Sequence, residues 1–306
     1  MNPFNPAGVI PILATPFGES ETLDLESLDR LVRFMAALHV DGVTVLGVLG
    51  ESNRLTDAER AAVIGTAVAA AGGHMPVVVG ASHPGTRATL DLIRMAADHG
   101  AHAVMVAPTA EPVPNDERVF EYYRRIGADS PLPIIVQDHP ASTAVHMGVP
   151  LLLRIVGDGG PVAGIKLEAV PTAPKLRALR TGMGQRQVRI LTGLGALYGR
   201  FDLEAGSDGF NTGFAFPEVL QAMVAAAGGG DWARVNALYA RFLPLMVFEQ
   251  QPGVAVRKEI LRRRGLLAQA TVRHPGGPLP AGAAEQLDRL LDDILPGADL
   301  KKPLAP

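Results

Sequence analysis

The chain has 306 residues, of which 47% are hydrophobic, 19% are charged and 5% are aromatic, and its formal net charge is -3. This length suffices for one α/β barrel with a short extension or for two unrelated domains. The small net charge and the scarcity of aromatic residues argue against a nucleic-acid-binding protein, and the densest basic cluster, Arg262-Arg263-Arg264, is typical of the solvated end of a helix.

Short runs rich in β-branched residues alternate with longer helical patterns, which is typical of βα units and a parallel sheet. We predict strands, in chain order, at residues 9–13, 42–46, 76–79, 103–106, 133–136, 162–166, 188–191 and, more weakly, 207–211. Most are followed by stretches whose apolar residues recur every three or four positions, as in residues 25–37, 56–71 and 86–99.

Near-continuous hydrophobic strands such as residues 77–79 and 134–136 are expected where both faces of a sheet are covered, in a barrel or in an open doubly wound sheet. The first turn, residues 14–18, lacks the glycine spacing of a dinucleotide-binding turn. The glycine-rich segments at residues 157–160 and 228–230 follow helical patterns and indicate helix ends. Because eight βα repeats fill a barrel, we predict an α/β fold, a (β/α)8 TIM barrel, without a nucleotide site.

After about residue 230 the strand pattern ends. Residues 232–247, 254–264 and 283–294 have helical patterns and are joined by turns that contain proline and glycine. We therefore predict a catalytic barrel over residues 1–230 and a C-terminal helical extension over residues 231–306.

Composition also bears on compartment and cofactors. The chain has no cysteine, which excludes disulfides and cysteine-ligated zinc and fits a reducing compartment, although a bacterial periplasm would suit it too. Residues 1–6 lack a basic start and an apolar core, and no run of about 18 apolar residues follows. No pair of histidines lies at zinc-ligand spacing on a recognisable helix. We expect a cytoplasmic protein with no membrane partner, metal or other cofactor.

In a barrel, functional residues gather where strands end and loops begin. The second predicted strand runs into Gly47-Val48-Leu49-Gly50-Glu51-Ser52. Its two glycines allow a tight turn whose N–H groups could hold a substrate carboxylate, although an ordinary glycine turn explains them as well. The fifth strand ends in the polar cluster Gln137-Asp138-His139-Pro140. Polar loops are common, and a single histidine such as His139 is more often structural than catalytic.

The sixth predicted strand ends on Lys166. A lysine packed among apolar groups can have a pKa low enough to act as a nucleophile and form imines. If the extended geometry continues, Lys166 and Glu168 point to one side and Leu167 to the other. An ionised Glu168 would favour the ammonium form, whereas a protonated one could act as a general acid, and a plain salt bridge is the structural alternative.

These residues resemble the dihydrodipicolinate synthase and N-acetylneuraminate lyase superfamily of imine-forming barrels, and the likeness covers nearly the whole chain. Residues 47–60 are similar to that family's G-x-x-G-E followed by L-T-x-x-E. Supporting motifs are Thr15-Pro16-Phe17 after the first strand, Val106-Ala107-Pro108 after the fourth and Gly164-Ile165-Lys166 in the sixth. The resemblance implies that Lys166 is the imine-forming lysine.

The chain also departs from the family pattern. Gln137 stands where the synthases and sialic acid lyases have a proton-shuttling tyrosine, and Gln137 cannot titrate. Val48 and Leu49 replace hydroxyl-bearing residues, Ser142 replaces the arginine that receives aspartate semialdehyde, and the tyrosine expected near residues 109–110 is missing. These departures argue against a lysine-biosynthetic synthase.

Gln137-Asp138 together with Lys166-Leu167-Glu168 is more similar to a subset of the family that dehydrates 2-keto-3-deoxy sugar acids. We therefore predict a lyase that binds a 2-oxo acid as an imine on Lys166, with Glu168 handling the protons. It would dehydrate, or cleave by retro-aldol reaction, a 2-keto-3-deoxy sugar acid or a related pyruvate-derived substrate.

For the substrate we predict that Gly47, Val48 and Leu49 hold the carboxylate. The candidates for contacts with its hydroxyl groups are Gln137, Asp138, Ser142 and Asn211. Two alternatives stay open: a condensation like that of 4-hydroxy-tetrahydrodipicolinate synthase, and a barrel that only binds a small acid or serves as a structural oligomer. The resemblance implies a homo-oligomer, a tetramer in most family members.

Overall fold

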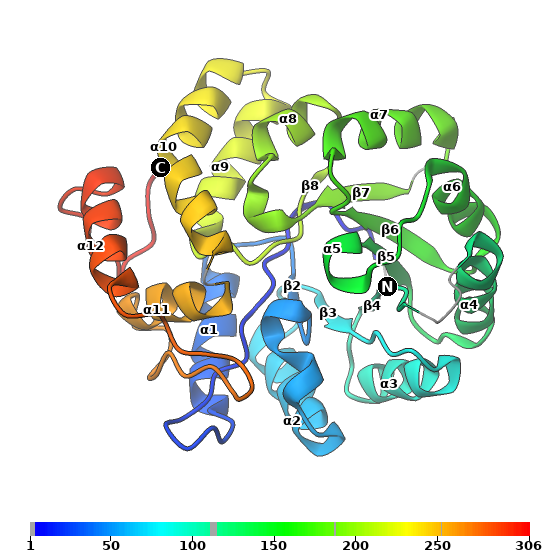
Figure 1. Cartoon of the computed structure of the whole chain (residues 1–306), viewed down its shortest axis with the longest axis horizontal. Coiled ribbons are helices and arrows are strands. Elements are labelled where there is room, and N and C mark those ends of the chain that lie inside the picture. The colour runs from blue at the N-terminus through cyan, green and yellow to red at the C-terminus, as the bar shows by residue number, and fades with distance from the viewer. Residues whose placement is uncertain (1–3, 111–114, 187, 252) are drawn as a thin grey trace.

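The computed structural model describes residues 4–110, 115–186, 188–251 and 253–306. Eight parallel strands form one sheet in the order β1-β8-β7-β6-β5-β4-β3-β2, with helices packed around it (Figure 1). The strands are β1 Gly8–Val9, β2 Val43–Val45, β3 Val77–Gly80, β4 Ala103–Val106, β5 Ile134–Asp138, β6 Val162–Leu167, β7 Arg189–Thr192 and β8 Gly209–Phe210. Each overlaps a predicted strand, and the predicted barrel is confirmed.

The first strand is shorter than predicted, because Pro11 has no N–H to donate to a ladder. Residues 10–13 nevertheless stay bonded on both sides. The Ile10 N–H donates to Phe210 O over 2.8 Å, and the Leu13 N–H donates to Thr44 O over 2.9 Å. This segment therefore joins β8 to β2 and closes the sheet into a barrel.

The described helices connect the strands and then continue past the last one. They are α1 Leu25–Ala37, α2 Asp57–Ala71, α3 Thr86–Asp98, α4 Asp116–Asp129, α5 Pro140–Thr143, α6 Val149–Asp158, α7 Thr172–Met183, α8 Gly199–Glu204, α9 Pro217–Gly228, α10 Trp232–Gln250, α11 Val254–Arg263 and α12 Ala283–Ile294. Three short 3₁₀ helices, η1 Val48–Gly50, η2 Ser52–Arg54 and η3 Leu194–Ala196, lie in the loops after β2 and β7.

Local chemistry explains several helix ends. The L-T-x-x-E motif is a capping box, in which the Thr56 hydroxyl accepts from the Glu59 N–H and the Glu59 carboxylate accepts from the Thr56 N–H. The motif therefore starts α2. The predicted glycine stops are also confirmed, since Gly159 caps the end of α6 and Gly229 the end of α9.

Side chains alternate between two cores, as strand geometry requires. One face of the strands packs with the surrounding helices, in a cluster that includes Val77, Val79 and Ile134. The other face fills the barrel interior with Ile12, Val78, Ala103, Met105 and Ile135. Leu49 packs against this interior cluster from the loop after β2. The barrel is thus a filled core, and a site must lie at its mouth.

The helices after residue 230 share a core with the barrel. Val235 and Phe242 of α10 are buried in one cluster with Val9 of β1 and Phe210 of β8, and α10, α11 and α12 lie together along one side of the barrel (Figure 1). The division of the chain into residues 1–230 and 231–306 stays a prediction.

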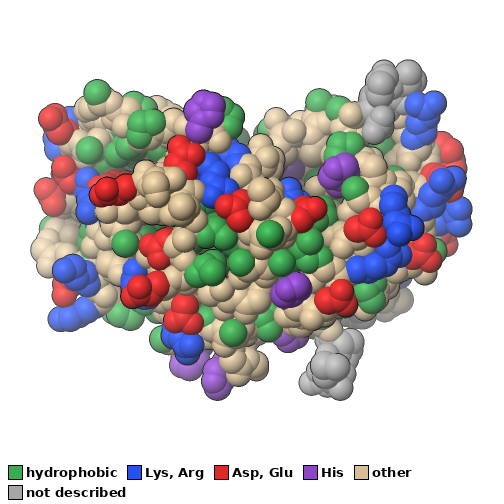
Figure 2. Space-filling model, turned by 90° about the horizontal axis from the view of Figure 1, so that it is seen from below, with side chains coloured by type: hydrophobic (Ala, Val, Ile, Leu, Met, Phe, Trp, Pro, Cys, Tyr) green, Lys and Arg blue, Asp and Glu red, His purple; other side chains and the backbone are tan. Residues whose placement is uncertain are grey.

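On the face of the molecule in Figure 2, basic and acidic side chains are interspersed rather than gathered by sign. Among the described residues, no helix combines the length and the apolar character that a membrane crossing needs. The predicted lack of nucleic-acid and membrane partners stays a prediction.

One buried ion pair connects α11 to the loop after β2. Lys258 Nζ lies 2.5 Å from Glu51 Oε1, and both side chains are almost completely buried. Glu51 Oε2 also accepts from Arg54 and from the Arg273 N–H. The glutamate of the G-x-x-G-E motif therefore anchors its loop to the helical extension.

We expect Lys258→Met to lower the free energy of unfolding by about 3 kcal/mol, because it removes one of the two cations that pair with the buried Glu51 carboxylate, Arg54 being the other. Urea denaturation monitored by circular dichroism measures this change. The matched control is Lys302→Met. The Lys302 side chain is 78% exposed in its pair with Asp299, so this variant should change stability by less than about 0.5 kcal/mol. Equal stabilities of the two variants would contradict the anchoring role.

Candidate active site

A cavity of about 90 Å³ opens at the carboxyl ends of the strands. Its walls come from β5, β6, the loops after β1, β2, β7 and β8, and the ends of α10 and α11. The lining residues are Ile12, Val48, Leu49, Gln137, His139, Lys166, Glu168, Leu194, Gly195, Thr212, Gly213, Gln250 and Arg257. Active sites of TIM-barrel enzymes lie at this end of the barrel.

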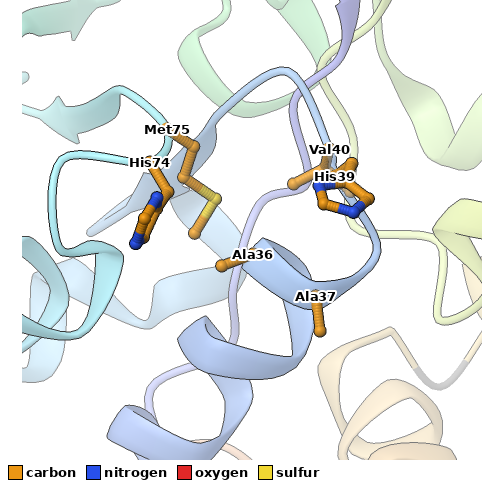
Figure 3. A pocket seen from close by; sticks show the side chains of 6 residues that line it. All are labelled: Ala36, Ala37, His39, Val40, His74 and Met75. Carbon is orange, nitrogen blue, oxygen red and sulfur yellow. The ribbon is translucent and has the colours of Figure 1, made fainter.

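A larger cavity of about 450 Å³ lies at the opposite end, between the end of α1 and the loops that lead into β2 and β3. Figure 3 shows His74 and Met75 on one side of it and His39 and Val40 on the other. Its lining holds no lysine, arginine or carboxylate. The smaller cavity is therefore the candidate active site.

Lys166 and Glu168 face each other in this smaller cavity. Lys166 Nζ lies 3.2 Å from Glu168 Oε2, and the side chains are 4% and 6% exposed. The extended geometry continues past β6, because the Glu168 N–H donates to Asp138 O over 2.9 Å. Leu167 packs into the outer core with the helices. The predicted alternation thus brings an amine and a carboxylate together at the barrel mouth.

Two neighbours fix the Glu168 carboxylate. Gln137 Nε2 donates to Oε2 over 2.8 Å, and the Leu194 N–H donates to Oε1 over 3.1 Å. The loop after β7 can come this close because residue 193 is glycine: a Cβ there would lie 2.0 Å from Glu168 Oε1. Sequence reasoning missed Gly193 and Leu194. The available signal was the position of Gly193 directly after the seventh strand.

Burial and charge shift both pKa values. Burial lowers the pKa of the Lys166 amine, and this outweighs the opposing charge of Glu168. Burial raises the pKa of the Glu168 carboxyl, but Lys166, His139 and the two hydrogen bonds outweigh it and hold that pKa below its usual range. Glu168 is therefore a carboxylate at neutral pH, and it lies beside an amine that loses its proton more readily than a surface lysine does.

Val48 and Leu49, two of the predicted carboxylate-binding residues, line the cavity from η1, and Gly47 caps that helix. The N–H groups in the first turn of a helix have no acceptor within the helix. Donation from the Val48 and Leu49 N–H groups to a substrate carboxylate stays a prediction. His139 also lines the cavity.

Three predicted substrate-binding residues lie outside the lining. Asp138 points the other way from Gln137, as strand alternation requires, and its Oδ2 lies 2.5 Å from Lys175 Nζ. The Ser142 hydroxyl lies 2.7 Å from His139 Nδ1. Asn211 Nδ2 donates to Ile10 O over 2.8 Å and to Thr44 Oγ1 over 2.9 Å. Asn211 therefore links the first, second and eighth strands inside the barrel.

Sequence reasoning also missed Arg257 and Gln250, which reach the cavity from the helical extension. Neither follows a barrel strand, so no strand-end pattern could identify them. Among the described residues, no cluster of three or more histidine, aspartate or glutamate side chains could hold a metal ion. The predicted absence of a metal stays a prediction.

The chain is similar to known proteins in both sequence and fold. A model of the Dihydrodipicolinate synthetase family matches residues 5–294. The chain is 33% identical over 273 residues to L-2-keto-3-deoxyarabonate dehydratase of Azospirillum brasilense, with 88% of each chain covered. It is 31% identical over 288 residues to 4-hydroxy-tetrahydrodipicolinate synthase of Chlorobium luteolum, with 92% of this chain and 94% of the relative covered.

Among solved structures, dihydrodipicolinate synthase from Rhodopseudomonas palustris superposes with a TM-score of 0.90 at 37% identity. The match covers 94% of this chain and 97% of that one. The relatives thus share the barrel and its extension, and their names cover two activities, a dehydratase and synthases.

The pairing predicts how Lys166 titrates. We expect Glu168→Gln to lower the pKa of Lys166 further, by about 1 pH unit or more, because the carboxylate charge that favours the ammonium form is lost. Methylation of the lysines with ¹³C-formaldehyde and an NMR titration measure this midpoint. Glu259→Gln, which removes a carboxylate of α11 that pairs with Arg262 and Arg263 and does not line the cavity, serves as the control and should leave the midpoint unchanged. A Lys166 midpoint that stays fixed or rises in Glu168→Gln would show that the two groups do not interact.

Proposed function

The chain belongs to the dihydrodipicolinate synthetase family, as the motif in residues 47–60 predicted, and on this premise we propose that it is a lyase acting on a 2-oxo acid through an imine on Lys166. The observation that carries the proposal is the buried Lys166 amine, 3.2 Å from the Glu168 carboxylate in a cavity at the barrel mouth. A desolvated amine is the nucleophile that imine formation requires.

The proposed reaction starts with the neutral Lys166 amine, which attacks the C2 carbonyl of the substrate. Loss of water gives an iminium, and its positive nitrogen draws electrons from C3 and makes the C3 proton acidic. Glu168 removes that proton, and the electron pair forms an enamine. The enamine then expels the hydroxyl group from C4, which leaves as water with the proton that Glu168 took. Loss of a proton from C5 and protonation at C3 then move the new C3=C4 double bond, so that the C5 hydroxyl becomes the aldehyde of a semialdehyde. Hydrolysis of the remaining imine releases this product and regenerates Lys166.

Among the possible outcomes we favour dehydration of a 2-keto-3-deoxy sugar acid. The similarity to a dehydratase of 2-keto-3-deoxyarabonate supports this substrate class. If the C4 hydroxyl is deprotonated instead, the same iminium drives retro-aldol cleavage. A condensation like that of 4-hydroxy-tetrahydrodipicolinate synthase is the alternative that other relatives favour, but Gln137 offers no titratable hydroxyl for it.

The proposed chemistry needs neither a metal nor an organic cofactor, because the iminium itself accepts the electron pair. We propose that the protein acts in the cytoplasm on a small 2-oxo acid, and that it assembles as a homo-oligomer, a tetramer by the family resemblance. The Val48 and Leu49 N–H groups are the proposed carboxylate contacts from the barrel, and Gln137 is the proposed contact for a substrate hydroxyl.

Borohydride trapping tests the imine. With pyruvate and borohydride, the wild-type protein should gain the mass of one reduced adduct, and peptide mapping should place it on Lys166. Lys166→Ala should gain none, whereas Lys302→Ala, which lacks an exposed lysine, should be trapped like the wild type. If the wild type forms no adduct with any 2-oxo acid, the non-catalytic binding barrel is the better description.

Turnover tests the role of Glu168. Incubation with 2-keto-3-deoxy sugar acids should yield a 2-oxo semialdehyde if the enzyme dehydrates them, or pyruvate and an aldehyde if it cleaves them. We expect Glu168→Gln to keep trapping while kcat falls by about 100- to 10,000-fold, because the base at C3 is lost. Glu259→Gln is again the matched control. Unchanged turnover in Glu168→Gln would eliminate this role.

A further inference from the structure

Arg257 places a buried positive charge in the wall of the candidate active site. Its side chain is 7% exposed and lines the same cavity as Lys166. It comes from α11, after the last barrel strand. The two cations are close enough that the charge of Arg257 contributes to lowering the pKa of Lys166. Lowering the pKa of Lys166 does not by itself explain why a second buried cation, Arg257, lines the cavity.

The guanidinium is held from behind, away from the cavity. Arg257 Nε donates to Glu249 Oε2 over 3.0 Å. Glu249 is fully buried, and its Oε1 accepts from the Ala215 N–H over 3.2 Å, which ties the pair to the loop after β8. Among the residues that the structure describes, Glu249 is the only hydrogen-bond acceptor of Arg257, and it accepts from Nε. The N–H groups of the two terminal nitrogens are therefore available to a ligand.

These terminal nitrogens lie beside the cavity. A Cβ on Gly195, a lining residue with φ +66, would lie 2.3 Å from Gln250 Nε2 and 3.2 Å from Arg257 Nη2. Gly195 thus gives room to the Gln250 amide and to the guanidinium beside it in the loop after β7. The planar group of N–H donors that remains is the geometry that recognises a carboxylate.

The charges of the lining fit a single carboxylate. Glu168 balances Lys166, and after imine formation it balances the iminium in the same way. Arg257 then remains as the lining cation without a lining counterion. From the barrel side, the loop after β2 offers only backbone N–H groups, because Val48 and Leu49 have no polar side-chain atoms.

We propose that Arg257 binds the carboxylate next to the 2-oxo group of the substrate and so selects 2-oxo monocarboxylic acids. This inference rests on the proposed function, because it assumes that a 2-oxo acid occupies the cavity. A second carboxylate on the substrate would find no further free cation among the described lining residues. A purely structural Arg257–Glu249 pair would instead stabilise the fold without discriminating between ligands.

The experiment compares three probes in the borohydride trapping assay: pyruvate, methyl pyruvate, whose carboxylate is masked, and 2-oxoglutarate, which carries a second carboxylate. In the wild type, pyruvate should be trapped at the lowest concentration. In Arg257→Gln, the pyruvate concentration for half-maximal trapping should rise by about 10- to 100-fold, as expected when a charge-assisted hydrogen-bond partner is lost. Methyl pyruvate should show a much smaller change, because only the effect of the lost Arg257 charge on Lys166 reaches it.

Two further variants control for the loss of a positive charge on α11 and for a folding defect. Arg262→Gln removes a positive charge from an exposed position on the same helix and should trap all three probes like the wild type. The double variant Glu249→Gln, Arg257→Gln replaces the buried ion pair with two amides, so a folding defect caused by an unpaired Glu249 would be relieved there. It should keep the full loss of pyruvate preference.

The outcomes separate the two proposals. Unchanged pyruvate trapping in Arg257→Gln overturns the role of Arg257 while the imine on Lys166 stands. Loss of 2-oxoglutarate trapping alone also overturns it, because Arg257 would then bind a distal carboxylate. If the wild type forms no adduct, the proposed function fails, and calorimetric titration of pyruvate decides the inference separately: affinity that is absent, or equal in wild type and Arg257→Gln, overturns it.

Discussion

Lys166 and Glu168 are almost completely buried at the mouth of the barrel, with the amine 3.2 Å from the carboxylate. Burial opposes the charge on each group, while each charge stabilises the other. The balance leaves Glu168 ionised and makes the Lys166 proton easier to remove. Because this balance depends on excluding water, the filled barrel below the pair and the loops around it are parts of the site as much as the pair itself.

The helical extension completes the site from outside the barrel. Two buried ion pairs hold it in place. Lys258 pairs with Glu51 and so connects α11 to the loop after β2. Arg257 of α11 pairs with Glu249 of α10 within the extension, and the Ala215 N–H, which donates to Glu249, connects that pair to the loop after β8. In both pairs burial disfavours the charged form of the side chain: it lowers the pKa of Lys258 to about 8 and raises that of Glu249 to about 7. Such pairs cost desolvation energy, and they fix where the loops lie more than they stabilise the fold.

Most of the fold could be predicted from strand periodicity, because a parallel barrel repeats one local pattern eight times. It identified the strands and placed Lys166 and Glu168 on one side. The same rule, applied to the fifth strand, would have turned Asp138 away from Gln137. Asn211 was predicted to contact substrate because it is polar and lies at a strand end, yet the hydrogen bonds of its side-chain amide link strands inside the barrel. Arg257 could not be predicted, because only the tertiary packing of α11 brings it to the strand ends.

The exchange of a tyrosine for Gln137 and the presence of Glu168 are physically linked, since the Gln137 amide donates to the Glu168 carboxylate over 2.8 Å. A carboxylate is a weak base, and it can take a C3 proton only after an iminium has made that proton acidic. Glu168 already lies beside Lys166, so the charge that forms on the nitrogen would form where the base is held. A hydroxyl shuttle that carries protons to a second carbonyl substrate is then unnecessary. For this physical reason we propose elimination of water rather than condensation with a second carbonyl compound.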